Sequence, residues 1–422
     1  MVYISRNLES QIKENLDKPE IIAILGPRQS GKTTLLKHIF QTLENAVFIS
    51  FDDRMVLEMF VEDEQTFAEL YVKNNRYLFI DEFQYAKEGG QKLKYIYDHY
   101  PETKILVSGS SAPGLTIHGI KYLIGRIFVF NLYPLSFEEF LRYRNEELFD
   151  AYLSRKDAIR AYLYEKGELP VLSKPLMEML NVIYDEYIVY GGYPRVAISN
   201  SVEEKRLVLK NIYSTYFLRE IKDMLSLTTD FNLSRLIRAL SIELGGLISY
   251  ASLGEVSGFD YKGLLWHLNI LEKTFICKRI VPFFTNKRTE IIKVPKVYFF
   301  DNGFRNTIID DFRPCDLRQD IGMLNETFIF SQLAYGGVEV KFWRSKSKAE
   351  VDFIVEKEGR LIAIESKSSY QRKTKSLMHF KEKYEPYRTV IASKEVLKDS
   401  DGVLYLPFAF ISSILDNVGK KM

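Results

Sequence analysis

Residues 26–33 of this 422-residue chain read Gly26-Pro27-Arg28-Gln29-Ser30-Gly31-Lys32-Thr33. The stretch has the form G-x-x-x-x-G-K-T, follows the apolar run Ile21–Leu25 and precedes a helical pattern at Leu35–Phe40. In this strand–loop–helix context the two glycines let backbone N–H groups turn toward phosphate oxygens, and the start of the helix adds partial positive charge. The sequence therefore predicts a site for a nucleoside triphosphate.

The residues of this loop have distinct expected contacts. We expect Lys32 to reach the β- and γ-phosphates and Thr33 to hold Mg²⁺, so that ATP and Mg²⁺ are the predicted cofactors. No role for Arg28 follows from its position. The predicted nucleotide contacts are Gly26, Pro27, Arg28, Gln29, Ser30, Gly31, Lys32, Thr33 and Thr34.

Strand and helix patterns alternate through residues 20–132. Short β-rich runs separated by longer helical patterns indicate an α/β fold, in which a parallel sheet is covered by helices on both faces. The predicted strands are Ile21–Leu25, Val47–Phe51, Tyr77–Ile80, Lys104–Val107 and Ile127–Leu132.

Two acids, Asp81 and Glu82, directly follow the apolar run Tyr77–Ile80. Ligands of open α/β sheets bind beyond the carboxyl ends of the strands, so both acids are expected beside the phosphate loop. We expect Asp81 to hold Mg²⁺, directly or through water, and Glu82 to polarise the water that attacks the γ-phosphate. The alternative is a pair of solvated acids that end a strand.

Two further residues are candidates for the reaction. Ser108 follows the run Lys104–Val107 and is expected to sense the γ-phosphate or to orient the attacking water. Arg126 precedes Ile127–Leu132, and its delocalised charge suits a γ-phosphate bound by a neighbouring subunit. The alternative for Ser108 is an ordinary polar residue at the end of a strand. The alternative for Arg126 is an ion-paired arginine on the surface.

Residues 18–140 resemble the AAA+ ATPases, since the phosphate loop, the Asp-Glu strand, the serine-bearing strand and a Gly-Arg pair occur in the family's order. The phrases DEFQ, SGSS, GR and YPLSFEEF more specifically resemble the bacterial and archaeal AAA-type ATPases whose C-terminal half is the DUF4143 region. The resemblance implies a sensor 1 role for Ser108 and an arginine-finger role for Arg126. With Lys32 and Glu82, whose roles follow from the motifs, these are the predicted catalytic residues. The resemblance also implies the strand order 5-1-4-3-2 and a homo-oligomer.

Beyond this ATPase core (residues 1–140), residues 141–228 are rich in helix formers and aromatics, which predicts a helical lid. The turn Tyr190-Gly191-Gly192-Tyr193-Pro194-Arg195 interrupts the lid. In AAA+ relatives an arginine after such a turn contacts the nucleotide as sensor 2, and the resemblance implies this role for Arg195. The alternative is an arginine that caps the C-terminus of a helix.

Residues 229–298 predict a winged helix, because helical patterns separated by a turn lead into two strand runs, Phe275–Pro282 and Glu290–Val297. In a DNA-binding version the helix Asp260–Lys273 enters the major groove. A rigid spacer or protein dock is the alternative. The residues expected on its exposed face are Tyr261, Lys262, Trp266, His267 and Asn269, with Lys287 and Arg288 at the tip of the wing.

Residues 299–422 carry a second acidic pattern. Two strand runs, Glu350–Val355 and Leu361–Lys367, flank a turn at Gly359, so the side chains of Asp352 and Glu365 are expected side by side. The two carboxylates can hold Mg²⁺, and Lys367 can orient a water molecule or steady the scissile phosphate.

Asp352 followed by Glu365-x-Lys367 resembles the PD-(D/E)xK nuclease superfamily, although Val351 stands where that family has proline. The resemblance implies a restriction-endonuclease-like α/β domain. A nuclease-derived fold that binds nucleic acid or protein without cutting is the alternative. The predicted magnesium ligands of this second site are Glu326, Asp352 and Glu365, with Lys367 beside them.

The charge and composition restrict the class of protein. The formal net charge is +2, from 58 basic and 56 acidic side chains, which excludes a globally basic nucleic-acid binder but not a local basic patch. Two cysteines provide no disulfide framework, which indicates a reducing compartment. The first ten residues do not resemble a signal peptide and no apolar run would span a bilayer, so we expect a cytoplasmic protein with no membrane partner.

These modules together predict an ATP-binding and ATP-hydrolysing AAA+ protein that acts on DNA through a winged helix and a nuclease-like domain. The alternative is a nucleotide-dependent switch or scaffold whose C-terminal domains dock proteins without cutting nucleic acid. The near-neutral net charge favours this alternative slightly. A P-loop kinase is a third possibility, but nothing in the sequence resembles a site for a small substrate.

Overall fold

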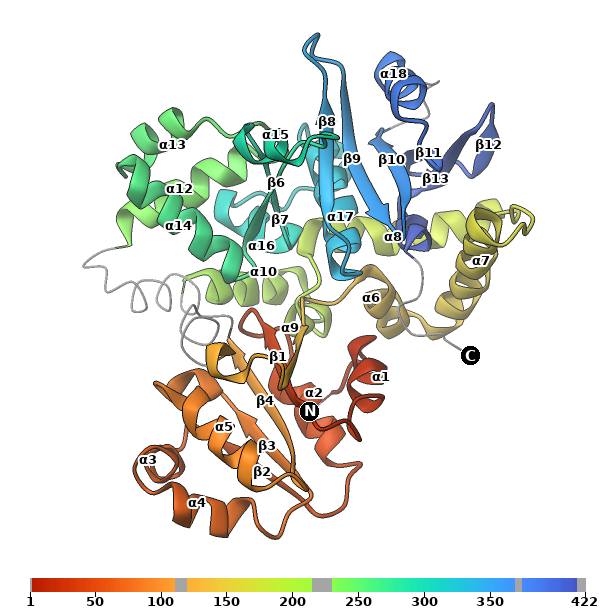
Figure 1. Ribbon diagram of the computed structural model, residues 1–422. Helices are drawn as coiled ribbons and strands as arrows, with labels where there is room; N and C mark the ends of the chain where they lie inside the picture. The colour runs from red at the N-terminus through yellow and green to blue at the C-terminus, as the bar shows by residue number, and fades with distance from the viewer. Residues whose placement is uncertain (1, 111–119, 215–229, 369–373, 416–422) are drawn as a thin grey trace.

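The computed structural model describes residues 2–110, 120–214, 230–368 and 374–415. Figure 1 shows a five-stranded sheet with its helices, coloured red to orange, beside a larger body that contains the second half of the chain. Among the described residues no helix is long and apolar enough to cross a membrane.

The first sheet is entirely parallel and has the order β2-β3-β4-β1-β5. The strand order 5-1-4-3-2 is therefore confirmed. All five expected strands are present, within two or three residues of their predicted ends. Their bounds are β1 (Ile21–Gly26), β2 (Ala46–Ser50), β3 (Tyr77–Asp81), β4 (Lys104–Ser110) and β5 (Ile127–Asn131).

Helices cover both faces of this sheet, which explains why its central strands are apolar on both sides. On β1, Ile21 and Ala23 pack with α3, α4 and α5, whereas Ile22 and Ile24 pack with α1 and α2. The helices are α1 (Leu8–Lys13), α2 (Lys32–Phe40), α3 (Arg54–Glu62), α4 (Glu64–Tyr71) and α5 (Gly89–His99), with the short 3-10 turns η1 (Phe83–Tyr85) and η3 (Ile120–Leu123).

The described part of the next segment consists, as expected, of helices joined by loops. It shares one hydrophobic core with the C-terminal half of the chain. The ring of Tyr152 stacks on Phe410 at 4.8 Å, and the ring of Phe137 meets Phe328 edge-on at 5.7 Å. The helices are α6 (Phe137–Arg144), α7 (Glu146–Tyr164), α8 (Lys174–Tyr190), α9 (Pro194–Ala197) and α10 (Val202–Asn211).

The described part of the predicted winged-helix region contains four helices and a two-stranded antiparallel sheet. The prediction of a strand at Glu290–Val297 is wrong over its first part, because residues 287–292 form a short helix. The side chain of Asn286 caps the first turn of this helix. The elements are α12 (Phe231–Ile242), α13 (Tyr250–Ser257), α14 (Tyr261–Lys273), β6 (Cys277–Ile280), α15 (Lys287–Ile292) and β7 (Lys296–Phe299).

One residue of the expected DNA-facing surface lies on the wrong side of α14. His267 is buried, its ring stacks on Phe259 at 3.9 Å, and its Nδ1 lies 2.6 Å from the carbonyl oxygen of Gly263. Burial lowers the pKa of His267. The position is four residues beyond Gly263 and shares a helical face with Leu264 and Leu271, which point into the core.

The C-terminal sheet is mixed and has the order β12-β13-β11-β10-β9-β8. Helix α17 belongs to the core on one side of this sheet and α18 to the core on the other. The elements are α16 (Asn302–Ile309), η5 (Cys315–Leu317), α17 (Ile321–Tyr335), β8 (Val340–Arg344), β9 (Glu350–Lys357), β10 (Arg360–Ser366), α18 (Lys375–Tyr384), β11 (Arg388–Ser393), β12 (Lys398–Ser400), β13 (Val403–Pro407) and η6 (Phe408–Ile414).

A buried carboxylate joins the turn after α8 to this C-terminal half. Asp301 caps α16 by accepting a 2.7 Å hydrogen bond from the N–H of Phe304, and it accepts another of 2.7 Å from the N–H of Gly192. A Cβ on Gly191 would lie 2.2 Å from this carboxylate, and one on Gly192 would lie 2.2 Å from the carbonyl oxygen of Leu135. The two glycines are therefore required by close packing, and burial raises the pKa of Asp301 to about 6.

Asp301→Asn is expected to change how stability depends on pH. Because the folded chain binds the Asp301 proton more tightly than the unfolded chain, the stabilisation from this proton is complete below about pH 4 and is lost as the pH rises through about 6, a change of about 3 kcal/mol in the free energy of unfolding. Urea unfolding between pH 4 and 7 would measure it. The free energy of unfolding of Asp301→Asn should not decrease over this pH range, whereas that of the control Asp150→Asn, on the surface of α7, should decrease as in the wild type. The same pH dependence in the wild type and both variants would contradict the raised pKa of Asp301.

Candidate functional site

The glycine-rich loop lies between the end of β1 at Gly26 and the start of α2 at Lys32. Gly31 has φ 98°, in the left-handed region that favours glycine, and a Cβ on Gly26 would lie 2.1 Å from the carbonyl oxygen of Leu132. Both glycines of the motif are thus needed for the shape of the loop. Gln29 is also left-handed (φ 60°), and within the described part of the chain the buried hydroxyl of Ser30 has no hydrogen-bond partner.

Lys32 begins α2 and is only 5% exposed. Its Nζ donates to the carbonyl oxygens of Gly26 and Pro27, at 3.0 and 2.9 Å. The ammonium group is therefore held over the loop at the start of a helix, where an anionic phosphate group is stabilised. Thr33 and Thr34 follow in the first turn of this helix and are half-buried.

Asp81 and Ser108 lie on the neighbouring strands β3 and β4 and are both buried. The hydroxyl of Ser108 donates a hydrogen bond to Oδ1 of Asp81. The two side chains therefore meet at the carboxyl edge of the sheet. The hydroxyl proton of Ser108 points to Asp81, so its first role in this structure is to orient that carboxylate.

Glu82 follows Asp81 in a left-handed backbone conformation, with φ 56° and ψ 39°. Non-glycine residues pay about 1 kcal/mol or more for this conformation, and such residues concentrate at functional sites. Burial raises the pKa of Glu82, and the positive charges of Lys32 and Arg28 oppose that rise. The side chain of Gln84 donates a hydrogen bond to the Glu82 carboxylate.

Arg6 is a residue of this site that no sequence signal indicated. Its Nη1 donates to the carbonyl oxygen of Ser30 at 2.7 Å, and its Nη2 donates to that of Tyr133 at 2.6 Å. Its Nε lies 3.2 Å from the buried carboxylate of Glu139. These partners lie 24 to 133 residues away in sequence, so a lone arginine near the N-terminus gave no pattern that could reveal them.

Arg126 lies at the opposite end of the sheet from the loop of its own chain. The N–H of Ile21, the first residue of β1, donates to the carbonyl oxygen of Arg126 at 2.8 Å. The rest of β1 separates this point from Gly26, a distance of about 17 Å at 3.3 Å per residue. The guanidinium instead pairs with Asp98 at 3.2 Å, so Arg126 serves no nucleotide bound to its own loop in this structure.

Arg195 lies close to the loop in the backbone, but its guanidinium is engaged elsewhere. A Cβ on Gly31 would lie 3.7 Å from Cγ of Pro194, so the start of α9 packs near the loop. The guanidinium of Arg195 donates to Glu204 at 2.6 Å and to the hydroxyl of Ser199 at 3.2 Å. Arg28 extends from the loop toward the hydroxyl of Tyr85, at 3.3 Å.

The second acidic pattern also assembles in part. The antiparallel pairing of Phe353 with Ile364 places Asp352 and Glu365 at the next opposite positions of β9 and β10. Lys367 forms an ion pair with Glu365 at 2.7 Å, and the hydroxyl of Thr374 donates to the same carboxylate.

The three-carboxylate magnesium site is, however, not assembled in the described part of the chain. No group of three or more histidine, cysteine, aspartate or glutamate side chains there has a metal-binding arrangement. Glu365 is occupied by Lys367 and Thr374, while Glu326 on α17 accepts a 2.8 Å hydrogen bond from the hydroxyl of Tyr298. Burial, and next the neighbouring Glu326, raise the pKa of Asp352 to about 7.

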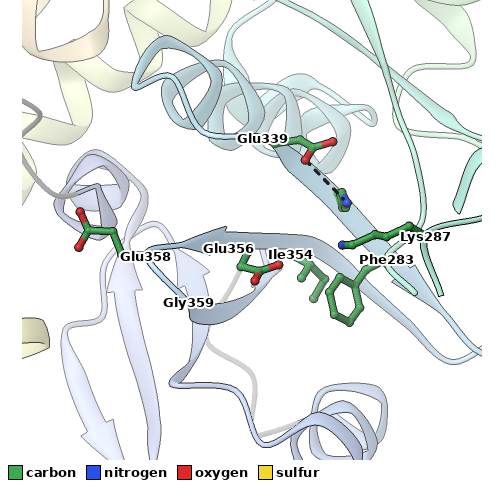
Figure 2. Close-up of a pocket in the computed structure, with 8 residues that line it drawn as sticks. Phe283, Lys287, Glu339, Ile354, Glu356, Glu358 and Gly359 are labelled. Atoms are coloured by element: carbon green, nitrogen blue, oxygen red, sulfur yellow. Dashed lines mark ion pairs between the residues drawn. The ribbon is translucent and has the colours of Figure 1, made fainter. Parts of the chain in front are cut away.

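A separate cavity of about 250 Å³ lies between the start of α15 and the strands β8 and β9. Figure 2 shows charges of both signs around it, with an ion pair of 3.7 Å between Glu339 and Lys341. Lys341 also pairs with Glu290 of α15 at 2.8 Å. This mixture of charges joins α15 to the C-terminal sheet. The cavity contains none of the predicted nucleotide or magnesium ligands, but Lys287, which was expected at the tip of the wing, lines it. The lining residues are Phe283, Lys287, Glu339, Lys341, Ile354, Glu356, Glu358 and Gly359.

Comparison with known families places recognised domains along the chain. Residues 18–141 match the model of an AAA domain, residues 181–314 match a domain of unknown function (DUF8612), and residues 321–411 match another, DUF4143. The chain therefore contains an AAA domain and a C-terminal DUF4143 domain. The resemblance stated from the motifs is confirmed at this level.

Similar proteins extend over most of the chain. An uncharacterised protein of Haemophilus influenzae is 24% identical over 90% of this chain and 92% of the relative, and one of Methanocaldococcus jannaschii is 23% identical over 83% of this chain and 75% of the relative. Domain III of the Thermotoga maritima replication initiation protein DnaA is 17% identical, with a TM-score of 0.29, over 50% of this chain and 95% of that structure.

Arg6→Ala is expected to destabilise the protein and to weaken nucleotide binding. It removes the charged partner of buried Glu139 and the donor to Ser30, which should lower the free energy of unfolding by about 3 kcal/mol. Chemical unfolding and titration with a fluorescent ATP analogue would measure both effects. The exposed Arg76, paired with Asp17, is the control, and Arg76→Ala should cost less than about 1 kcal/mol. If both variants lost the same amount of unfolding free energy and of nucleotide affinity, the contacts of Arg6 would contribute no more than an exposed ion pair.

Proposed function

We propose that this chain binds Mg²⁺–ATP at residues 26–34 and hydrolyses it to ADP and phosphate. The observation that carries the proposal is the placement of Lys32, Asp81 and Glu82 together at the carboxyl edge of a parallel sheet, beside a loop whose two glycines are required by its geometry. The AAA domain match over the same residues supports it.

Each residue of the site has a separate proposed role in phosphate binding, proton transfer or Mg²⁺ binding. Lys32 exchanges its two carbonyl partners for oxygens of the β- and γ-phosphates, and the N–H groups of the loop bind the remaining phosphate charge. Glu82, whose pKa is raised by burial, accepts the proton of the attacking water. Asp81 and Thr33 are the donors that suit Mg²⁺, because a carboxylate held by Ser108 and a hydroxyl in the first helical turn are both hard oxygen ligands. When bound, Mg²⁺ neutralises phosphate charge.

Arg126 supports a homo-oligomer as the active form. It lies at the far end of β1 from its own loop and pairs with a surface acid, Asp98, in a contact worth little free energy. A neighbouring subunit that packs its phosphate loop against this end of the sheet would place Arg126 at the γ-phosphate, where its delocalised charge stabilises the transition state.

The C-terminal half is proposed to act on DNA. Two observations support this proposal. Trp266 is 54% exposed on α14, where Lys262 is also exposed, and Asp352, Glu365 and Lys367 converge near the end of β10. A nucleotide-dependent switch that docks proteins is the second candidate. The pairing of Lys367 with Glu365 favours it, because that pairing occupies the lysine and the carboxylate that cleavage would use.

Two substitutions test ATP hydrolysis. Lys32→Ala should abolish ATP binding, because the loop loses its phosphate-binding charge, whereas Glu82→Gln should bind ATP but hydrolyse it at least about 100-fold more slowly, because the base is lost. Phosphate release and equilibrium binding would measure the two effects. Glu88→Gln is the matched control, since Glu88 is exposed and also left-handed (φ 61°), and it should hydrolyse normally. Full turnover by the Glu82 variant would refute its role.

DNA action has a separate test. Affinity for a DNA duplex should fall steeply as salt is raised, because contacts to phosphate release counterions, and Lys262→Ala should reduce the slope of log affinity against log salt by about 1. Asp352→Ala should remove any Mg²⁺-dependent cleavage while leaving affinity intact. DNA affinity that does not change with salt would favour the protein-docking switch instead.

A further inference from the structure

Gln84 connects the predicted catalytic base to the strand beside the phosphate loop. It lies in the short turn η1, two residues after Glu82, and is half-buried. Its Nε2 donates to Oε2 of Glu82, and its Oε1 accepts a 3.1 Å hydrogen bond from the N–H of Ser110 at the end of β4. The sequence analysis predicted no role for this side chain.

The chemistry of the two partners determines the orientation of the Gln84 amide. The carboxylate of Glu82 only accepts at neutral pH, and the N–H of Ser110 only donates, so the amide nitrogen must face the first and the amide oxygen the second. Rotating the amide by half a turn would break both bonds. The side chain is therefore fixed at both ends in one arrangement.

This arrangement relates Glu82 to the phosphate loop. Ser110 is paired in register with Gly26, the first glycine of the loop, across the neighbouring strands β4 and β1. Gln84 thereby ties Oε2 of Glu82 to a backbone position next to the loop. In the described part of the chain, Oε1 of Glu82 accepts no hydrogen bond, which leaves that oxygen available to a water molecule.

We propose that Gln84 is a positioning residue for ATP hydrolysis, which holds one carboxylate oxygen of Glu82 so that the other faces the attacking water. The inference rests on the proposed hydrolysis. In that step the water oxygen forms a bond to the γ-phosphorus, the bond from the γ-phosphorus to the bridging oxygen breaks with its electron pair going to ADP, and the water proton passes to Oε1 of Glu82. Gln84 touches none of the reacting atoms and acts only through Glu82.

Gln84→Ala tests the proposal in the full-length protein, with Gln91→Ala as the matched control because Gln91 is an exposed glutamine of the same domain. Misplacing a catalytic group by about 1 Å costs up to about 100-fold in rate, so kcat should fall at least about tenfold while the affinity for ATP stays within about twofold. Gln84→Glu keeps the length of the side chain but removes its donor, and it should lose at least as much rate.

A double-mutant cycle separates positioning from general damage. Single-turnover rates are measured for Glu82→Gln alone and for Glu82→Gln combined with Gln84→Ala. If Gln84 acts through Glu82, the second substitution should lower the residual rate by less than about twofold. A tenfold loss in both backgrounds, an equal loss of ATP affinity, or an unchanged kcat in Gln84→Ala would each overturn the proposal. Full turnover by Glu82→Gln alone would instead refute the proposed hydrolytic role of Glu82.

Discussion

The buried guanidinium of Arg6 holds the phosphate loop to the segment that leaves the first sheet. It bonds at once to the carbonyl oxygens of Ser30 and Tyr133 and to the carboxylate of Glu139. The carboxylate of Glu139 in turn accepts from the N–H groups of Asn7 and Ser136, at 2.6 and 2.9 Å. A buried charge is costly unless it is paired, and these contacts of Arg6 and Glu139 hold the loop and the chain on either side of the sheet as one unit.

This unit continues into the C-terminal half through close contacts. The ring of Tyr133 stacks on Tyr335 at 4.6 Å, and the side chain of Gln332 accepts a 2.8 Å hydrogen bond from the N–H of Phe137. Both partners belong to α17, the helix that carries Glu326 of the second acidic pattern. A single helix therefore contacts the segment that leaves the first sheet and bears one of the acids beside Asp352. Helix α17 therefore connects the segment that leaves the first sheet to the second acidic pattern.

The arrangement of the glycine-rich loop and of the acids beside it was largely predictable, because it depends on patterns that are local in sequence. The glycine-rich loop, the strand before it and the helix after it occupy consecutive residues, and an acid at the end of an apolar strand is brought to the same edge by the rule of parallel sheets. The prediction of the second acidic site was less accurate. The hairpin rule paired Asp352 with Glu365 correctly, but no local rule indicates that Lys367 and Thr374 occupy Glu365 or that the hydroxyl of Tyr298 bonds to Glu326.

The errors have the same cause. The periodicity of α14 marks a helix, but whether His267 faces solvent depends on Phe259, which packs against it from the preceding turn. The sequence alone determined the α/β class of the first domain, its strand order by resemblance and the residues that would meet a phosphate, since these follow from hydrophobic periodicity and the conformational needs of glycine. Only the tertiary structure decided that Arg6 anchors the loop, that Gln84 holds Glu82 and that Arg126 points away from its own site, because these depend on contacts between segments whose separation no periodic pattern encodes.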